Sequence, residues 1–444
     1  MGSNLLTRMF LSGALLASSA ALTVSQAVPA AAANPPVLPP ALAAAYGSTP
    51  AFADEFNDGD VNENDWYYRI TGPYNNAYMH KDEVDESGNA LHLAYNKRDV
   101  SGDGVPDYVS GGLISRHNFG YGYYETRAKL YAGTAPLHTS FWSMGLRKDM
   151  KGAGGDPRIN EDIANGILPE NNQIFEIDGF EHDTGPHPDV IDMGNYPQSV
   201  GTTKVRVGKQ PAADLGINFA DWNVYGYEYT PQSIKFYING VQIGPTIDNV
   251  ATKYQYNPMN LWLTALPYYP AAQSVSAGSS DFDYVRYWNK PLDGANLLGN
   301  GSFDAVPVNA ADLWIVPGWI ESYSPPASAI ATDVVSNGTR SLIHKSSSAY
   351  TVTTKQNLTH IPNGTYKLKA KVQSSGGQTS VRMRVLNHGS SEVSVPVPTG
   401  STWMDIEIPN ISVTNNKATI AFTSNASANQ WMRVDAVSFA RTTP

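Results

Sequence analysis

Apolar and polar residues alternate over short stretches of this chain with a period of two. Residues 90–95, 123–130 and 233–238 show this alternation, and glycine, proline or asparagine separates such stretches. Because the side chains of a β-strand point alternately to its two faces, the pattern predicts strands with one buried face. Long amphipathic helices are scarce in the sequence. The chain is therefore predicted to be all-β, with sheets packed as sandwiches.

One predicted strand, residues 174–183, carries acidic side chains among apolar ones. It reads Ile-Phe-Glu-Ile-Asp-Gly-Phe-Glu-His-Asp, so Glu176, Asp178 and Glu181 lie within six residues. An ionised carboxylate in an apolar setting costs several kcal/mol unless it has a partner or loses its charge. These three acids therefore indicate a functional site, although a solvated acidic strand edge is the alternative interpretation.

The spacing of the acids predicts an irregularity in the strand. Glu176 and Asp178 share a face, whereas Glu181, five positions after Glu176, would point to the other face of a regular strand. A β-bulge inserts one unpaired residue and restores the alignment. Gly179 is the residue that best tolerates the unusual backbone angles of a bulge. We therefore expect a bulge at Gly179 and all three acids on one face.

Two glutamates with an aspartate between them suit the hydrolysis of a glycosidic bond. That reaction needs one carboxylate at the anomeric carbon and one carboxylic acid that protonates the leaving oxygen. A negative neighbour such as Asp178 would help to keep one of the two glutamates protonated near neutral pH. The acids thus predict a glycoside hydrolase.

The stretch Glu-Ile-Asp-Gly-Phe-Glu at 176–181 resembles the bulged signature of glycoside hydrolase family 16, which includes laminarinases, agarases, porphyranases and κ-carrageenases. Further stretches resemble motifs of that family in the same order and extend the resemblance over about residues 50–290: 53–56, 121–129, 140–144, 222–231, 234–240 and 282–288. The resemblance implies a β-jelly-roll sandwich with a concave substrate cleft.

The resemblance also implies roles for individual residues. Glu176 would be the nucleophile, Glu181 the general acid/base, and Asp178 the residue that holds and tunes them. Six residues are predicted to bind substrate, with a structural role as the alternative for each: Trp142, Arg116, Asn171, Gln173, His138 and His182.

The N-terminal region predicts export. Within residues 1–33, Arg8 precedes an apolar stretch that ends near Val28, and four alanines follow as small residues for cleavage. This composition is typical of a secretory signal peptide, so we expect a secreted protein. Residues 34–48 begin Asn-Pro-Pro-Val-Leu-Pro-Pro and are predicted to be a stiff linker that need not fold.

Two domains are expected after the linker, since the chain is several times longer than a usual domain of roughly 100 to 200 residues. The catalytic domain would span 49–291. Residues 296–442 resemble carbohydrate-binding modules of the jelly-roll type and predict a second, smaller β-sandwich. Its candidate ligand-binding residues are aromatic, with a place in the core as the alternative: Trp314, Trp319 and Trp431.

The composition of the chain limits the kinds of partner that it can bind. The net charge of -10 argues against a nucleic-acid partner and against a polybasic membrane-binding patch. The chain has no cysteine, so its stability does not depend on disulfides. We expect a monomer whose partner is a polysaccharide. Catalysis would require no cofactor. The resemblance implies a structural Ca²⁺ in many family members, and Asp283 matches a position that often supplies a ligand.

The sequence therefore predicts a secreted, retaining endo-β-glycosidase that hydrolyses internal linkages of a β-linked polysaccharide. A galactan of the agar, porphyran or carrageenan type is slightly preferred, because His138 stands where many laminarinases carry a tryptophan. A β-1,3-glucan comes next. A transglycosylase and a non-catalytic polysaccharide-binding protein are the alternatives.

Overall fold

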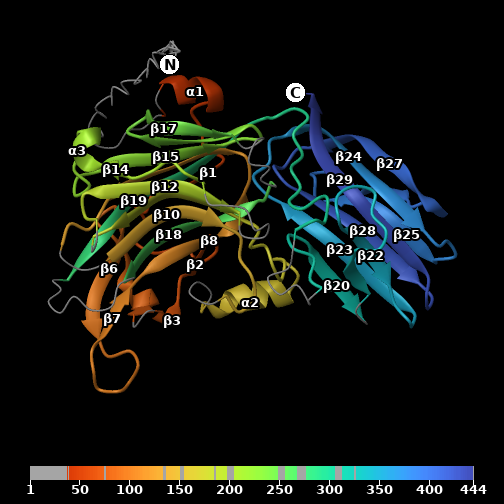
Figure 1. Ribbon diagram of the computed structural model, residues 1–444, viewed down its shortest axis with the longest axis horizontal. Helices are drawn as coiled ribbons and strands as arrows, with labels where there is room; N and C mark the ends of the chain where they lie inside the picture. The colour runs from red at the N-terminus through yellow and green to blue at the C-terminus, as the bar shows by residue number, and fades with distance from the viewer. Residues whose placement is uncertain are drawn as a thin grey trace, which may run out of the picture.

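Four mostly antiparallel β-sheets, packed as two sandwiches, form most of the structure (Figure 1). The computed structural model describes these residues: 38, 40–74, 77–133, 137–150, 155–184, 187–197, 205–248, 256–267, 277–305, 313–324 and 327–443. The predicted signal peptide, residues 1–33, lies outside them. No helix in this described part is long and apolar enough to cross a membrane.

The first sandwich pairs an 11-stranded sheet with an 8-stranded sheet. The 11-stranded sheet has the order β17-β16-β15-β9-β19-β6-β7-β4-β3, with β1 beside β19 and β5 beside β6. Its strands are β1 (Phe52–Asp54), β3 (Thr71–Tyr74), β4 (Ala77–Met79), β5 (Val84–Ser87), β6 (Ala90–Arg98), β7 (Asp107–Ser110), β9 (Gly122–Lys129), β15 (Asn223–Tyr229), β16 (Ser233–Ile238), β17 (Val241–Asp248) and β19 (Gly278–Asn289).

The 8-stranded sheet has the order β13-β12-β11-β10-β18-β8-β2, with β14 beside β12. Its strands are β2 (Trp66–Tyr68), β8 (Gly112–Phe119), β10 (Leu137–Met144), β11 (Phe175–Asp183), β12 (Val190–Pro197), β13 (Val205–Arg206), β14 (Gln210–Pro211) and β18 (Met259–Pro267).

The second sandwich pairs two 5-stranded sheets, with the orders β20-β23-β28-β25-β26 and β21-β22-β29-β24-β27. Its strands are β20 (Ile320–Ser324), β21 (Ser328–Ala331), β22 (Ser341–Lys345), β23 (Tyr350–Leu358), β24 (Gly364–Ser374), β25 (Ser380–Leu386), β26 (Val393–Pro396), β27 (Gly400–Val413), β28 (Ala418–Ala426) and β29 (Trp431–Thr443).

Each sandwich has an apolar core of its own. In the first, Phe141 and Phe180 of the 8-stranded sheet meet Tyr225 and Tyr227 of the 11-stranded sheet. In the second, a separate cluster includes residues from 297 to 439. The all-β sandwich fold that the alternating pattern predicted is confirmed.

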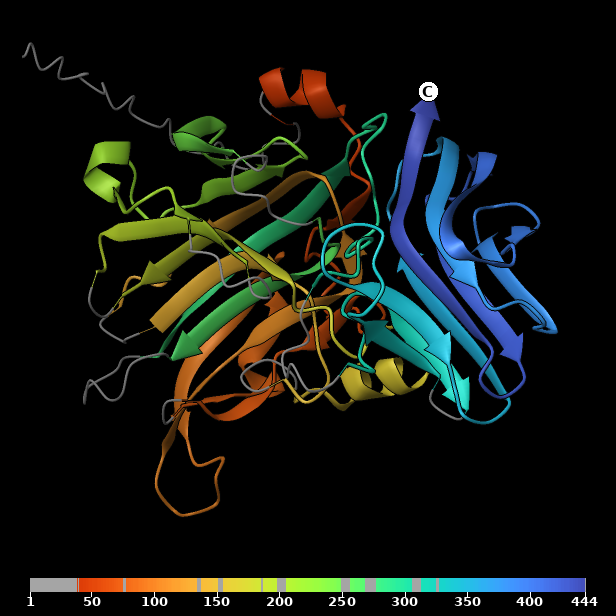
Figure 2. The same cartoon turned by 45° about the vertical axis from the view of Figure 1, so that its right-hand side comes forward.

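The two sandwiches lie side by side (Figure 2), and polar and aromatic side chains join them. The Thr359 hydroxyl donates to the Asn118 carbonyl oxygen at 2.9 Å, and the Asn289 side chain donates to the carbonyl oxygen of His360 at 2.7 Å. The His360 ring also lies against Phe119, with ring centroids 5.0 Å apart. Contacts of this kind hold one sandwich against the other.

The helices among the described residues are few and short. They are α1 (Pro40–Tyr46), α2 (Pro157–Ala164), α3 (Ala212–Leu215) and the 3-10 turn η1 (Lys81–Glu83). Asp156 caps α2, because its carboxylate accepts the backbone N–H of Arg158.

Helix α1 lies within the predicted linker, residues 34–48, so part of this segment is folded. Leu42 is only 6% exposed and packs among aromatic residues on the outer side of the 11-stranded sheet. The Tyr46 hydroxyl donates to Glu228 of β15 at 2.7 Å. This segment folds because its apolar residues find a surface that the linker composition did not reveal.

The predicted bulge is present in β11. Phe180 pairs with Phe141 of β10, but the next pair in β10 joins Trp142 to Asp178, so Gly179 has no partner there. The pairing of β11 with β12 shifts by one residue in the same place. The bulge of one residue at Gly179 is therefore confirmed.

The reason for glycine at this position differs from the expected one. The φ angle of Gly179 is not positive, so its backbone conformation does not require glycine. Instead, a Cβ atom at position 179 would lie 2.8 Å from the ring and carbonyl oxygen of Phe141 and 2.8 Å from the ring of Tyr227. The bulge needs glycine because neighbouring atoms fill the space of a side chain.

Gly179→Ala should consequently destabilise the first sandwich by about 1–3 kcal/mol, the usual cost of overpacking a core. The measurement is the urea midpoint of unfolding, followed by tryptophan fluorescence. An unchanged midpoint would show that the strands separate freely around the new methyl group.

Candidate active site

The bulge determines which face of the sheet receives the acids. Before it, Ile177 points into the core, and after it Phe180 does the same. Glu176 and Glu181 are partly exposed and Asp178 is 2% exposed, on the opposite side of the strand from these core residues. The three acids therefore share the outer face of the 8-stranded sheet, as the spacing predicted.

Strand β10 places an aromatic ring next to the acids. Trp142 lies directly opposite Asp178, and Ser140 lies directly opposite Glu181. Directly opposed side chains share a face and have Cβ atoms roughly 4.5–5.5 Å apart. The Trp142 ring is only partly buried, so part of it is available to a ligand.

The orientation of Trp142 is held from three sides. Its ring packs on Trp262 of β18 with centroids 4.5 Å apart, and its Nε1 donates to the Thr264 hydroxyl at 3.1 Å. The Arg69 guanidinium lies 5.7 Å from the Trp142 ring centroid and donates to Thr264 at 2.8 Å. These contacts keep the ring in one position.

The sequence interpretation missed Trp262, Thr264 and Arg69. A signal for the first two exists, because Trp262 and Thr264 alternate with core residues in β18. Nothing in the local sequence identifies Arg69, which comes from the segment after β2.

Among the predicted substrate-binding residues, His138 contacts Glu181, the predicted general acid. Its Nδ1 is 2.7 Å from Asp183, and its Nε2 is 3.4 Å from Glu181. Burial lowers the pKa of His138, but the hydrogen bonds with Asp183 and Glu181 outweigh this effect and raise its pKa to about 9. The ring is therefore positively charged at neutral pH. Asp183, two residues after Glu181, was not predicted.

Arg116 and Asn171 lie away from the acids. Arg116 belongs to β8, separated from β11 by two strands, which corresponds to about 14 Å. Its guanidinium pairs with Asp162 of α2 at 2.6 Å. Asn171 is buried at the junction of the sandwiches, where its carbonyl oxygen accepts the N–H of Gly318. Arg116 and Asn171 therefore have structural partners, Asp162 and Gly318.

Gln173 comes closer to the acids. Its side-chain nitrogen lies 3.4 Å from the sulfur of Met144, and Met144 is directly opposite Glu176. Gln173 is therefore the second of the predicted polar residues, with His138, that the structure brings to the neighbourhood of the acids.

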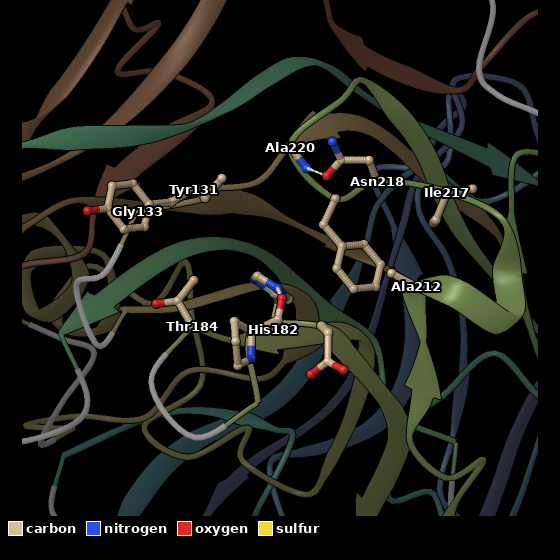
Figure 3. Close-up of a pocket in the computed structure, with 12 residues that line it drawn as sticks. Tyr131, Gly133, His182, Thr184, Ala212, Ile217, Asn218 and Ala220 are labelled. Carbon is tan, nitrogen blue, oxygen red and sulfur yellow. Dashed lines mark hydrogen bonds between the residues drawn. The ribbon is translucent and has the colours of Figure 1, made fainter.

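The prediction that His182 binds substrate beside Glu181 is wrong, because the His182 side chain points to the opposite side of the strand. His182 is 1% exposed, and its ring packs against Phe219 on the inner side of the strand. Its Nε2 donates to the Pro188 carbonyl oxygen at 3.0 Å. His182 lines a cavity of about 290 Å³ (Figure 3), and none of the three acids lines this cavity. Adjacent residues of a strand point to opposite faces, so the sequence contained this information.

Asp283 does not fit the expected calcium site. Its carboxylate pairs with Arg127 at 2.9 Å, so a cation would have to displace the guanidinium. In the part of the chain that the structure describes, no three His, Cys, Asp or Glu side chains gather as metal ligands. A calcium ion at Asp283 therefore gains no support.

The three candidate tryptophans of the second sandwich, Trp314, Trp319 and Trp431, occupy different environments. Trp319 is 1% exposed and donates to the Asn300 carbonyl oxygen, which makes it a core residue. Trp431 is partly buried, with the Arg433 guanidinium 6.0 Å from its ring. Trp314 is 49% exposed. Of the three, Trp314 has the ring most accessible to a ligand.

A curated relative matches most of the chain. It is keratan-sulfate endo-1,4-β-galactosidase from Sphingobacterium multivorum, 24% identical over 391 residues, which cover 84% of this chain and 82% of the relative. No protein-family model matches. At 24% identity the relative supports glycoside hydrolase chemistry.

Solved structures of two catalytic proteins are also similar. The laminarinase catalytic domain of Thermotoga maritima MSB8 has a TM-score of 0.42 and 18% identity, over 55% of this chain and 99% of that one. The endo-β-1,3-glucanase of Pyrococcus furiosus has a TM-score of 0.42 and 21% identity, over 53% of this chain and 93% of that one. Neither likeness assigns an activity at these values.

The environments of Trp319 and Trp314 predict effects of very different size on stability. Trp319→Ala should lower the free energy of unfolding of the second sandwich by about 3–5 kcal/mol, because it empties a buried indole site. Trp314→Ala, the matched control, should change it by less than about 0.5 kcal/mol. Calorimetric unfolding of both variants checks this, and equal effects would contradict the assignment of Trp319 to the core.

Proposed function

We propose that this protein is a secreted, retaining endo-β-glycosidase that hydrolyses internal linkages of a β-linked polysaccharide. The observation that carries the proposal is the bulge at Gly179, which brings Glu176, Asp178 and Glu181 to one face beside the ring of Trp142. Two carboxyl groups on one surface are the chemical requirement of this reaction. The similarity to an endo-galactosidase over most of both chains supports the same class of reaction.

The mechanism follows from the order of the acids along β11. Glu176 attacks the anomeric carbon while Glu181 gives its proton to the leaving oxygen, which leaves a glycosyl-enzyme. Glu181 then takes a proton from water as that water attacks the same carbon. Asp178, buried between the two glutamates, positions them. Stacking on Trp142 would hold the sugar against the acids.

The proposed substrate is a polysaccharide that contains β-linked galactose. The support is the printed activity of the Sphingobacterium multivorum relative, an endo-1,4-β-galactosidase that acts on keratan sulfate. The second sandwich is proposed to bind polysaccharide, and the exposed ring of Trp314 is the observation that supports it.

A screen of reducing-end release tests the proposal. Agarose, porphyran, carrageenans, keratan sulfate, laminarin and lichenan are incubated with the protein, and product sizes are followed over time. Early release of mixed oligosaccharides from a galactan is the expected result of internal cleavage. Release from laminarin alone would move the substrate to β-1,3-glucan, and release from none would defeat the proposal.

Glu176→Gln should lower kcat by at least about three orders of magnitude, because the amide cannot form the glycosyl-enzyme. The measurement is reducing-end release on the polymer found by the screen. The matched control is Glu170→Gln, a partly exposed glutamate paired with Lys148, which should retain activity. A binding protein without turnover would show no difference between the two variants.

Glu181→Ala should reduce turnover of the natural polymer by about 10²- to 10⁴-fold, the usual contribution of a general acid. Formation of the glycosyl-enzyme from an aryl glycoside with a good leaving group should be largely spared, because that oxygen needs no protonation. Rates on both substrates are compared, and an equal loss would sink the assignment of Glu181.

A further inference from the structure

Both ring nitrogens of His138 face carboxylates. Asp183 is the direct partner of His138 across β10 and β11, and its Oδ1 lies 2.7 Å from Nδ1. Glu181, two residues earlier on the same face, has its Oε1 3.4 Å from Nε2. An imidazole donates from both nitrogens only when it is protonated. The geometry therefore fits an imidazolium held between two acids.

The other charged groups around this pair come from the strands on each side. On β12, Asp192 lies opposite Glu181 and is paired with Arg206. On β11, Asp178 is the next acid along the face. On β18, the residue opposite His138 is Leu266, which does not ionise. Behind the sheet, burial lowers the pKa of His182, so this ring is neutral.

We propose that His138 is a positioning residue for Glu181: Asp183 orients its ring, and its positive charge favours the carboxylate form of Glu181. The inference rests on the proposed function, in which Glu181 is the general acid/base. The pKa of about 9 for His138, raised by Asp183 and Glu181 against the effect of burial, means that this charge persists through neutral pH.

The charge has a predictable effect on the reaction. Glu181 must be protonated to begin the reaction, and a neighbouring cation favours its ionised form. The basic limb of kcat/KM, which reports the essential acid of the free enzyme, should therefore lie at lower pH with the imidazolium than without it. In return, the imidazolium stabilises the Glu181 carboxylate that remains after the proton has moved to the leaving oxygen.

The test measures kcat/KM against pH for the full chain and two His138 variants. His138→Asn keeps a polar atom near the position of Nδ1, and His138→Gln keeps a neutral donor near the position of Nε2. Both remove the charge. Both should move the basic limb on the natural polymer upward by about one pH unit, the lower end of the effect of an adjacent opposite charge. Glycosyl-enzyme formation from an activated aryl glycoside should show no such shift.

Asp183→Asn gives a second route if the His138 variants fold poorly. Without the Asp183 carboxylate the ring should hold its proton less firmly, so an NMR titration of the His138 ring should show a lower pKa than in the wild-type protein, and an unchanged pKa would overturn the role of Asp183. The matched control is His92→Gln, which breaks a similar pair, His92 with Asp281 at 2.8 Å, on the other sheet. Its pH profile should be unchanged.

The outcomes separate this inference from the proposed function. If wild-type protein releases no reducing ends from any polymer, the proposed function fails. If wild-type protein is active and folded His138 variants keep its basic limb, or lose activity equally at every pH, the role of His138 is overturned. A shift in the His138 variants but not in His92→Gln supports it.

Discussion

The unpaired residue in β11 is the constraint on which the candidate site depends. Without it, the side chains beyond position 179 would exchange faces, so Glu181 would enter the core and Phe180 would leave it. Because Phe180 packs against Tyr225, the same bulge is needed to complete the apolar core. Stability of the core and placement of the acids therefore select the same backbone geometry. Phe141 and Tyr227 leave no room for a Cβ atom at position 179.

The acids of β11 concentrate negative charge on one side of this strand. Glu176, Asp178, Glu181 and Asp183 all lie on one side of this strand. Like charges this close disfavour joint ionisation, and an adjacent cation relieves the repulsion. His138 supplies such a cation between the last two acids. The charge balance of the site is therefore shared between two neighbouring strands.

The aromatic part of the site is assembled from distant segments. Trp142 belongs to β10, Trp262 and Thr264 to β18, and Arg69 follows β2. Their mutual contacts fix the Trp142 ring before any ligand arrives. A ring held in advance loses little conformational freedom on binding, which favours recognition of a sugar face. Pairing of β10 with both β11 and β18 is what places this ring next to the acids.

The all-β class, the bulge and the common face of Glu176, Asp178 and Glu181 could be predicted from the sequence alone, because each follows from a local period of two. That period also implied the inward direction of His182. The partners of other residues followed only from the tertiary structure. Arg127 forms an ion pair with Asp283, and Asp162 forms one with Arg116. Leu42 of α1 packs on the outer side of the 11-stranded sheet. Alternation along a strand depends on backbone geometry, which neighbours in sequence specify. An ion pair or a buried contact depends on which strands become adjacent, and that is settled only when the sheets pack.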